Sequence, residues 1–173
     1  MKTKQIFSIM NGFSWIVFIG YCIKAGAITL VSIISLFKNK NATENLYMGI
    51  DLASIYEFSI FHFVLTTLIL ILIASLKAYL FYLLIIIFKR IDLHKPFQID
   101  VTHLVFKISY VALTIGILGA VAKPYTIWLR TNVFFTQLDI GTSAYIFMAG
   151  VVFIVATLFK RAVEIKQEND LTI

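Results

Sequence analysis

The sequence predicts an all-α integral membrane protein: residues 1–173 form a single domain, a bundle of four transmembrane helices with the N- and C-termini in the cytoplasm. Two observations predict it. Hydrophobic residues make up 60% of the 173 residues and charged residues only 14%, whereas soluble domains have roughly 45–50% and about 25%. The apolar residues also gather in long stretches, and a chain this small cannot hide them all from water by folding alone.

The four predicted spans cover residues 6–37, 60–88, 104–122 and 140–159. Spanning a hydrocarbon core of ~30 Å takes roughly 20 helical residues, so each stretch is long enough. None shows the alternation of a transmembrane strand. The chain starts like a signal peptide, but the first stretch continues to Phe37. Because a cleaved apolar region is only ~7–15 residues long, we expect an uncleaved first span.

The charges of the connections set the predicted orientation, since cytoplasmic loops carry an excess of Lys and Arg. With both ends inside, eight basic residues are cytoplasmic: Lys2, Lys4, Lys89, Arg90, Lys95, Lys160, Arg161 and Lys166. Four are outside: Lys38, Lys40, Lys123 and Arg130. Within the second outer segment, residues 123–139, several aromatic residues follow Pro124. We expect that segment to lie in the membrane interface or to dip into it.

Small residues indicate where helices approach each other, because close backbone contact stabilises helix pairs in lipid. Ala112, Gly116 and Ala120 recur at four-residue spacing in the third span. We expect this stripe to meet a neighbouring helix within the bundle, and a homo-oligomer through the same stripe is the alternative. The sequence does not decide between the two.

Lys77 is the most unusual residue, because it lies within the second apolar stretch. A charge at mid-span costs about 2.5–3.5 kcal/mol on insertion scales and marks a functional site by default. It would hold an anion or lipid headgroup, or relay a proton. Alternatively, it snorkels to the inner headgroups or has a structural partner. The predicted partners are hydroxyls such as those of Tyr82 or Tyr110, and backbone carbonyls.

Other polar residues suggest little chemistry. Lys24 is expected near the outer surface, or, if buried, near Asp51 or Glu57, and Lys107 is expected as an interfacial anchor. The three histidines do not form a zinc motif, and phosphate-binding and nucleophile motifs are missing. The single cysteine excludes an internal disulfide. We therefore predict no catalytic residues, no cofactor, no metal and no direct binding of nucleic acid.

The C-terminal tail, residues 160–173, is predicted to extend the fourth helix into the cytoplasm to about Glu168. Its last ten residues, Glu-Ile-Lys-Gln-Glu-Asn-Asp-Leu-Thr-Ile, resemble the closing signature of the YoaS-like family, small bacterial membrane proteins of unknown function. That signature is a polar helical turn followed by Glu-Asn-Asp-Leu-Thr and an aliphatic residue. The inner turn, from His94 to Phe97 and on to Lys107, is similar to the family's Lys-x-Phe turn.

The resemblance implies a four-span protein of the bacterial cytoplasmic membrane without an established activity. Family members commonly lie beside a gene for a small helix-turn-helix regulator, which implies a transcription factor as partner. The surfaces expected to dock it are Lys95, Pro96, Phe97, Glu168, Asn169, Asp170, Leu171, Thr172 and Ile173.

Three hypotheses follow for the function. The first is a non-enzymatic sensor or membrane tether for such a regulator. The second is a small transporter or channel subunit that uses Lys77. The third is a lipid-modifying enzyme, which would need Lys77, His103 and Tyr110 around one cavity.

Overall fold

In the computed structural model, residues 2–37, 40–91, 98–133 and 141–170 are described. They form four long helices: α1 (Lys2–Phe37), α3 (Ile60–Arg90), α4 (Ile99–Asn132) and α5 (Ser143–Asp170). Two short elements, the 3-10 helix η1 (Lys40–Glu44) and α2 (Ala53–Phe58), lie between α1 and α3. All four long helices are long and apolar enough to cross a membrane.

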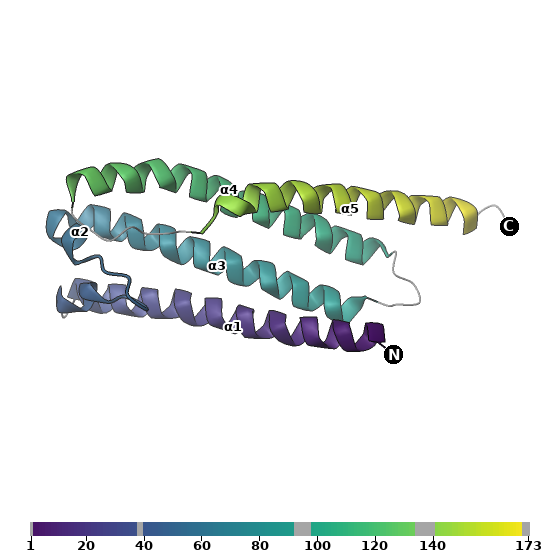
Figure 1. The fold of residues 1–173 in the computed structure, drawn as a ribbon, viewed down its shortest axis with the longest axis horizontal. Coiled ribbons are helices and arrows are strands. Elements are labelled where there is room, and N and C mark those ends of the chain that lie inside the picture. The colour runs from purple at the N-terminus through teal and green to yellow at the C-terminus, as the bar shows by residue number, and fades with distance from the viewer. Residues whose placement is uncertain (1, 38–39, 92–97, 134–140, 171–173) are drawn as a thin grey trace.

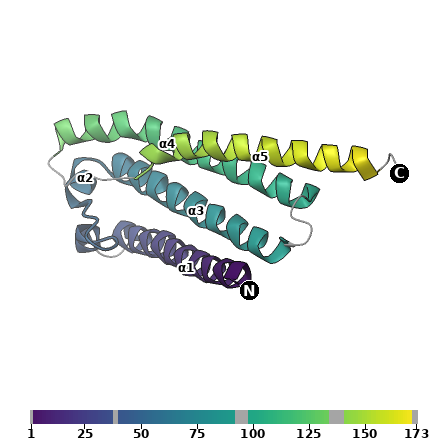
Figure 2. The same cartoon turned by 45° about the vertical axis from the view of Figure 1, so that its right-hand side comes forward.

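The long helices lie side by side in the order α1, α3, α4 and α5, so that α3 and α4 are central (Figure 1). The view turned by 45° shows the same order (Figure 2). α1 begins and α5 ends at the same end of the bundle, which we call the terminal end. The other end holds η1 and α2, and we call it the cap end.

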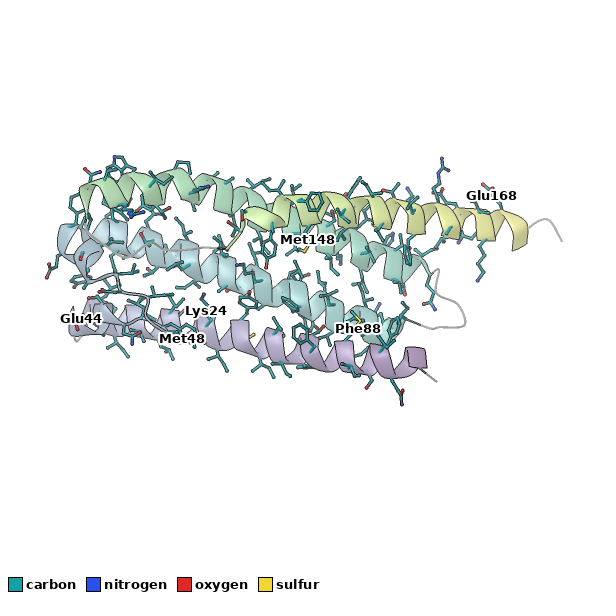
Figure 3. The ribbon with its side chains drawn as sticks, viewed as in Figure 1. Lys24, Glu44, Met48, Phe88, Met148 and Glu168 are labelled. Carbon is teal, nitrogen blue, oxygen red and sulfur yellow. The ribbon has the colours of Figure 1, made fainter. Side chains whose placement is uncertain are left out.

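Two groups of buried apolar residues hold the bundle together. At the cap end, Ile28, Leu52, Phe63 and Leu129 pack with Ile55 of α2 and with Leu46, which lies between η1 and α2. Nearer the terminal end, a second group joins α3, α4 and α5 and includes Ile73, Leu83, Ile108, Ala112, Ile115 and Ala149. The labelled Phe88 lies at the terminal end and Glu44 at the cap end (Figure 3).

The third helix is longer than predicted. The sequence predicts a span of 104–122 and a separate interfacial segment, but α4 runs unbroken from Ile99 to Asn132 with Pro124 inside it. Proline removes one backbone hydrogen bond and normally bends or ends a helix. Here the turn after Pro124 is tied to the cap, because Leu129 is fully buried and Tyr125 packs against the cap core.

α5 is shifted along the bundle relative to its neighbour. It starts about halfway along α4 and continues past the other helices at the terminal end (Figure 1). The predicted continuation of the fourth helix into the tail is confirmed, since α5 extends to Asp170.

The predicted small-residue stripe is correct for two of its three members. Ala112 and Gly116 are buried, but Ala120 is exposed and Gly119 is buried in its place. A side chain at Gly116 would collide with Ile146 of α5, and one at Gly119 would collide with Thr142. An α-helix has 3.6 residues per turn, so the residues that contact a neighbouring helix are separated by a mixture of three- and four-residue steps. The stripe is used within the chain, between α4 and α5.

Candidate functional site around Lys77

Lys77 lies near the middle of α3, 13 residues before its last residue, Arg90. At 1.5 Å per residue, about 20 Å of helix separates Lys77 from that end. Its side chain is only 8% exposed. A lysine in such a place needs partners that replace the water it has lost.

Three neighbouring elements supply contacts to the ammonium of Lys77. Its Nζ donates a hydrogen bond to the carbonyl oxygen of Gly141, at 3.1 Å, just before α5. It also lies 5.8 Å from the ring centroid of Tyr21 on α1 and 5.2 Å from that of Tyr145 on α5. Both distances are within the range of cation–π attraction. Lys77, on the central helix α3, therefore contacts both outer helices, α1 and α5.

The sequence explains why a backbone carbonyl is available beside Lys77. Gly141 has φ +54, a left-handed conformation that glycine adopts without a steric penalty. The helix follows at Ser143, and Thr142 is held tightly against Gly119. Non-helical backbone at membrane depth must be buried in protein or face a water-filled cavity. The ammonium of Lys77 satisfies a carbonyl of this segment.

The contacts of Lys77 are large enough to offset the cost of its position. Inserting a lysine at a helix centre costs about 2.5–3.5 kcal/mol. A hydrogen bond to a charged group contributes about 1.5–3 kcal/mol, and each cation–π contact about 0.5–2 kcal/mol. The two terms are similar in size, so these contacts can offset the insertion cost. This geometry is consistent with structural pairing, one of the predicted roles of Lys77, and the other roles stay predictions.

The two tyrosines predicted to accompany Lys77 lie in other clusters. Tyr82 is exposed and its ring lies 5.9 Å from that of Phe18. Tyr110 is exposed on α4 and stacks 6.5 Å from Phe106. A backbone carbonyl, the other kind of partner expected, is present. The tyrosines near the ammonium, Tyr21 and Tyr145, were not identified from the sequence.

A second polar group on the cap end was also missed by sequence reasoning. The Nδ1 atom of His62 lies 3.1 Å from the hydroxyl of Tyr125, which joins α3 to the end of α4. The His62 ring packs 5.3 Å from Trp128 and 5.7 Å from Phe58. A histidine at the start of one predicted span gave no signal, because the partner segment was not predicted to be helical.

The surfaces predicted to dock a partner are only partly described. Lys95, Pro96, Phe97, Leu171, Thr172 and Ile173 lie outside the described residues. Asn169 and Asp170 belong to α5, and Glu168 lies on the part of α5 that extends past the bundle (Figure 3).

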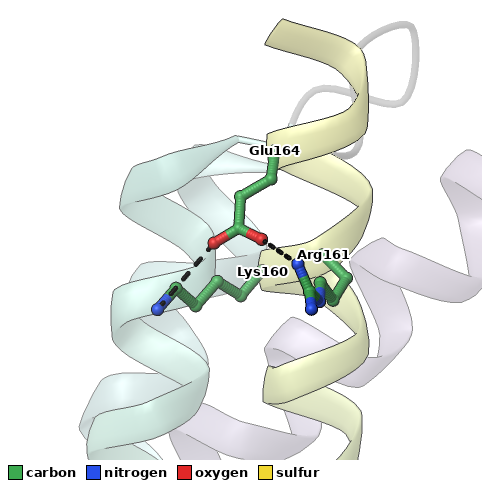
Figure 4. Close-up of polar contacts among 3 residues, drawn as sticks. All are labelled: Lys160, Arg161 and Glu164. Carbon is green, nitrogen blue, oxygen red and sulfur yellow. Dashed lines mark hydrogen bonds and ion pairs between the residues drawn. The ribbon is translucent and has the colours of Figure 1, made fainter. Parts of the chain in front are cut away.

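The projecting part of α5 carries a compact ion-pair network. Glu164 lies 3.1 Å from Arg161 and 3.9 Å from Lys160, one turn earlier (Figure 4). Such exposed pairs stabilise a helix by only about 0.3–0.5 kcal/mol each. The ion pairs act locally: they help to stabilise the helical turn after Lys160, where the neighbouring helices end.

Other sites suggested by the sequence are not formed by the residues named for them. Lys77 is inside the bundle, whereas His103 and Tyr110 are on the exposed face of α4, so these three do not surround one cavity. Within the described part of the chain, Lys24 and Asp51 form no ion pair. Within the described ranges, no three His, Cys, Asp or Glu residues are close enough to hold a metal ion.

One protein family matches the chain. It is described as "Protein of unknown function (DUF2975)", and the match covers residues 47–173. That region contains α2, α3, α4 and α5, and therefore both Lys77 and the projecting end of α5. No curated protein and no solved structure matches the chain significantly.

Proposed function

Because the chain belongs to the DUF2975 family, whose function is unknown, we propose a role from its own geometry: it is a membrane sensor or tether that presents α5 to a cytoplasmic regulator. One observation supports the proposal above others. α5 is a single helix of 28 residues that begins beside the Lys77 site and ends past the bundle. The helix is about 42 Å long. Because it is one continuous helix, a displacement at its start would also move its far end.

The proposal places the terminal end of the bundle in the cytoplasm. The support is the positive charge of that end, since Lys89, Arg90, Lys160 and Arg161 cluster where α3 and α5 leave the apolar region. Excess Lys and Arg favours the cytoplasmic side. The ring of Trp15 below Lys89, at 5.5 Å, is a typical interfacial anchor.

The partner in this proposal is a small helix-turn-helix transcriptional regulator. The support is the likeness of residues 164–173 to the closing signature of the YoaS-like family, whose members commonly lie beside a gene for such a regulator. An aliphatic C-terminus with a free carboxylate is a segment that a groove or backbone nest on a partner can capture.

Deletion of residues 169–173 tests the proposal. The full chain and the deletion variant are purified in mild detergent after co-expression with the candidate regulator. We expect the deletion to release the regulator while the protein still inserts and elutes as a single species. The matched control is Arg130→Gln, a charge change on the cap end. The proposal fails if the regulator co-purifies equally with all three proteins.

A second experiment tests the transmission along α5. Two glycines inserted after Phe159 interrupt the helix between the Lys77 site and the tail, since glycine is unfavourable by about 1 kcal/mol per residue in a helix. We expect Lys77→Met to change the amount of bound regulator in the parent but not in the protein with the insertion. An equal effect of Lys77→Met in both backgrounds contradicts transmission through α5.

The second candidate function is a small transporter or channel subunit. The observation that favours it is a buried ammonium beside non-helical backbone at Gly141, an arrangement that substrate sites of transporters also use. In proteoliposomes, Lys77→Met would then abolish flux while the protein stays folded. Absence of flux in the parent, or unchanged flux in the variant, counts against this function.

A further inference from the structure

The register between α4 and α5 determines which of their side chains lie at the same level. The Ser109 hydroxyl donates to the carbonyl of Ala149 at 2.9 Å, and the rings of Phe106 and Phe153 lie 5.5 Å apart. The helices run in opposite directions (Figure 1). Each residue toward the terminal end on α4 therefore corresponds to one residue further along α5, which puts Lys107 level with Val151 and Val152, and Phe106 level with Phe153.

Lys107 is an exposed cation at the side of this seam. It is in the third turn of α4, seven residues after Asp100, which corresponds to about 10 Å along the helix. His103, one turn earlier, is exposed on the same face. Side chains of a helix lean toward its N-terminus, so the Lys107 ammonium is directed toward the terminal end, near His103.

The carboxylates of the terminal end are engaged elsewhere. Asp100 lies 3.9 Å from Arg90, and Glu164 pairs with both basic residues of its own helix. Neither Lys107 nor His103 has an ion pair within the described part of the chain. Around them the described residues of α3, α4 and α5 at this end carry six Lys or Arg against four carboxylates: Lys89, Arg90, Lys107, Lys160, Arg161 and Lys166 against Asp100, Glu164, Glu168 and Asp170. Lys2 and Lys4, at the start of α1, add to the positive charge of this end.

An aromatic surface continues from Lys107 into the apolar part of the bundle. The ring of Phe153 contacts those of Phe106 and Tyr110, the latter at 6.4 Å, and Tyr110 is 56% exposed. His103 thus lies toward the polar end and Tyr110 lies deeper in the bundle than Lys107, with the rings of Phe106 and Phe153 beside them. A phospholipid has the same order of phosphate and acyl chain.

We propose that Lys107 and His103 bind the phosphate of an anionic phospholipid, whose acyl chain lies on Phe106, Tyr110 and Phe153. Charge complementarity selects the headgroup, since basic side chains at membrane level attract anionic lipids. The aromatic rings supply rigid apolar contact area for the chain. The lipid covers the seam between α4 and α5, and so contacts α5, the helix to which the proposed regulator binds. The lipid site does not depend on that regulator, because it requires only the membrane.

Native mass spectrometry of the full chain tests the site. The protein is released from detergent with phosphatidylglycerol or with phosphatidylcholine of the same acyl chains. We expect the parent to retain phosphatidylglycerol about tenfold better than phosphatidylcholine, and Lys107→Gln to lose that preference. Lys107→Arg keeps the charge and should retain it. Lys123→Gln, an exposed lysine of the same helix at its other end, is the matched control and should behave as the parent.

Two further arms separate the alternatives. Phe153→Ala should weaken retention of both lipids, because it removes chain contact and no charge. Inorganic phosphate at 10-fold excess over lipid should not displace phosphatidylglycerol, since it lacks the acyl chain. The proposal is overturned if Lys107→Gln retains phosphatidylglycerol as Lys123→Gln does, if the parent does not distinguish the two lipids, or if phosphate displaces the lipid.

Discussion

The ammonium of Lys77 lies 3.1 Å from the carbonyl oxygen of Gly141, and this contact ties the centre of α3 to the start of α5. The two residues are far apart in sequence, and the contact exists because α5 begins about halfway along the bundle. If α5 started at the cap end, its backbone carbonyls at the level of Lys77 would all accept hydrogen bonds within the helix. The position of Lys77 and the shift of α5 are thus two parts of one arrangement.

Two substitutions at Lys77 should distinguish the contribution of its charge to stability from that of its hydrogen bond. Lys77→Met removes this donor from the carbonyl of Gly141 and should lower the stability, because a hydrogen bond from a charged group contributes about 1.5–3 kcal/mol. Lys77→Gln keeps an N–H donor and should lose less. The midpoint of thermal unfolding in detergent measures both. Lys123→Met, at an exposed lysine of α4, is the control. Equal midpoints for the parent and Lys77→Met would show that the contact contributes nothing to stability.

Gly119 should tolerate no side chain. Gly119→Ala would place a methyl group against Thr142, and overpacking of this kind typically costs about 1–3 kcal/mol. Gly150→Ala, on α5 with open space around it, should be neutral or slightly stabilising. Thermal unfolding again measures the effect. Because Thr142→Gly removes the colliding atoms, the double variant with Gly119→Ala should recover part of the loss, and a failure to recover argues against the close approach.

The link between His62 and Tyr125 should stabilise the cap end. Tyr125→Phe removes the hydroxyl that lies 3.1 Å from Nδ1 of His62, and a hydrogen bond of this kind contributes about 0.5–1.5 kcal/mol. Tyr79→Phe, at an exposed tyrosine of α3, should change stability by less than about 0.5 kcal/mol. Denaturation of both variants in the same detergent checks the difference. A larger loss in Tyr79→Phe than in Tyr125→Phe would contradict it.

The first half of the bundle could be predicted from the sequence. The apolar runs place α1 and α3 within a few residues of their observed bounds, because the polar residues of the flanking segments begin close to where these helices end. Antiparallel pairing about a short connection also fixes the register of two helices. Tyr21 and Lys77 lie at almost equal distances from the centre of residues 38–59. This equal spacing indicates the contact between Tyr21 and Lys77.

In the second half, the extent of α4 could not be predicted in the same way. The same rule, applied about the centre of the predicted segment 123–139, pairs Gly116 with Ile146, which lie against each other in the structure, but it does not predict that α4 continues to Asn132. Lys123 and Pro124 indicate a helix end, but α4 continues beyond them, where Leu129 and Tyr125 pack at the cap core. Tertiary contacts of this kind override local sequence preference.

Cysteine cross-linking in membranes tests the shifted register of α5 most directly. The exposed native cysteine, Cys22, is first replaced by alanine. In that background the pair Ser109→Cys and Ala149→Cys should form a disulfide, since the Ser109 hydroxyl lies 2.9 Å from the Ala149 carbonyl. The pair Ser109→Cys and Lys166→Cys should not. Peptides joined by the disulfide are identified by mass spectrometry after proteolysis. Cross-linking of 109 to 166 and not to 149 would contradict the account, because α5 would then start at the cap end, away from Lys77.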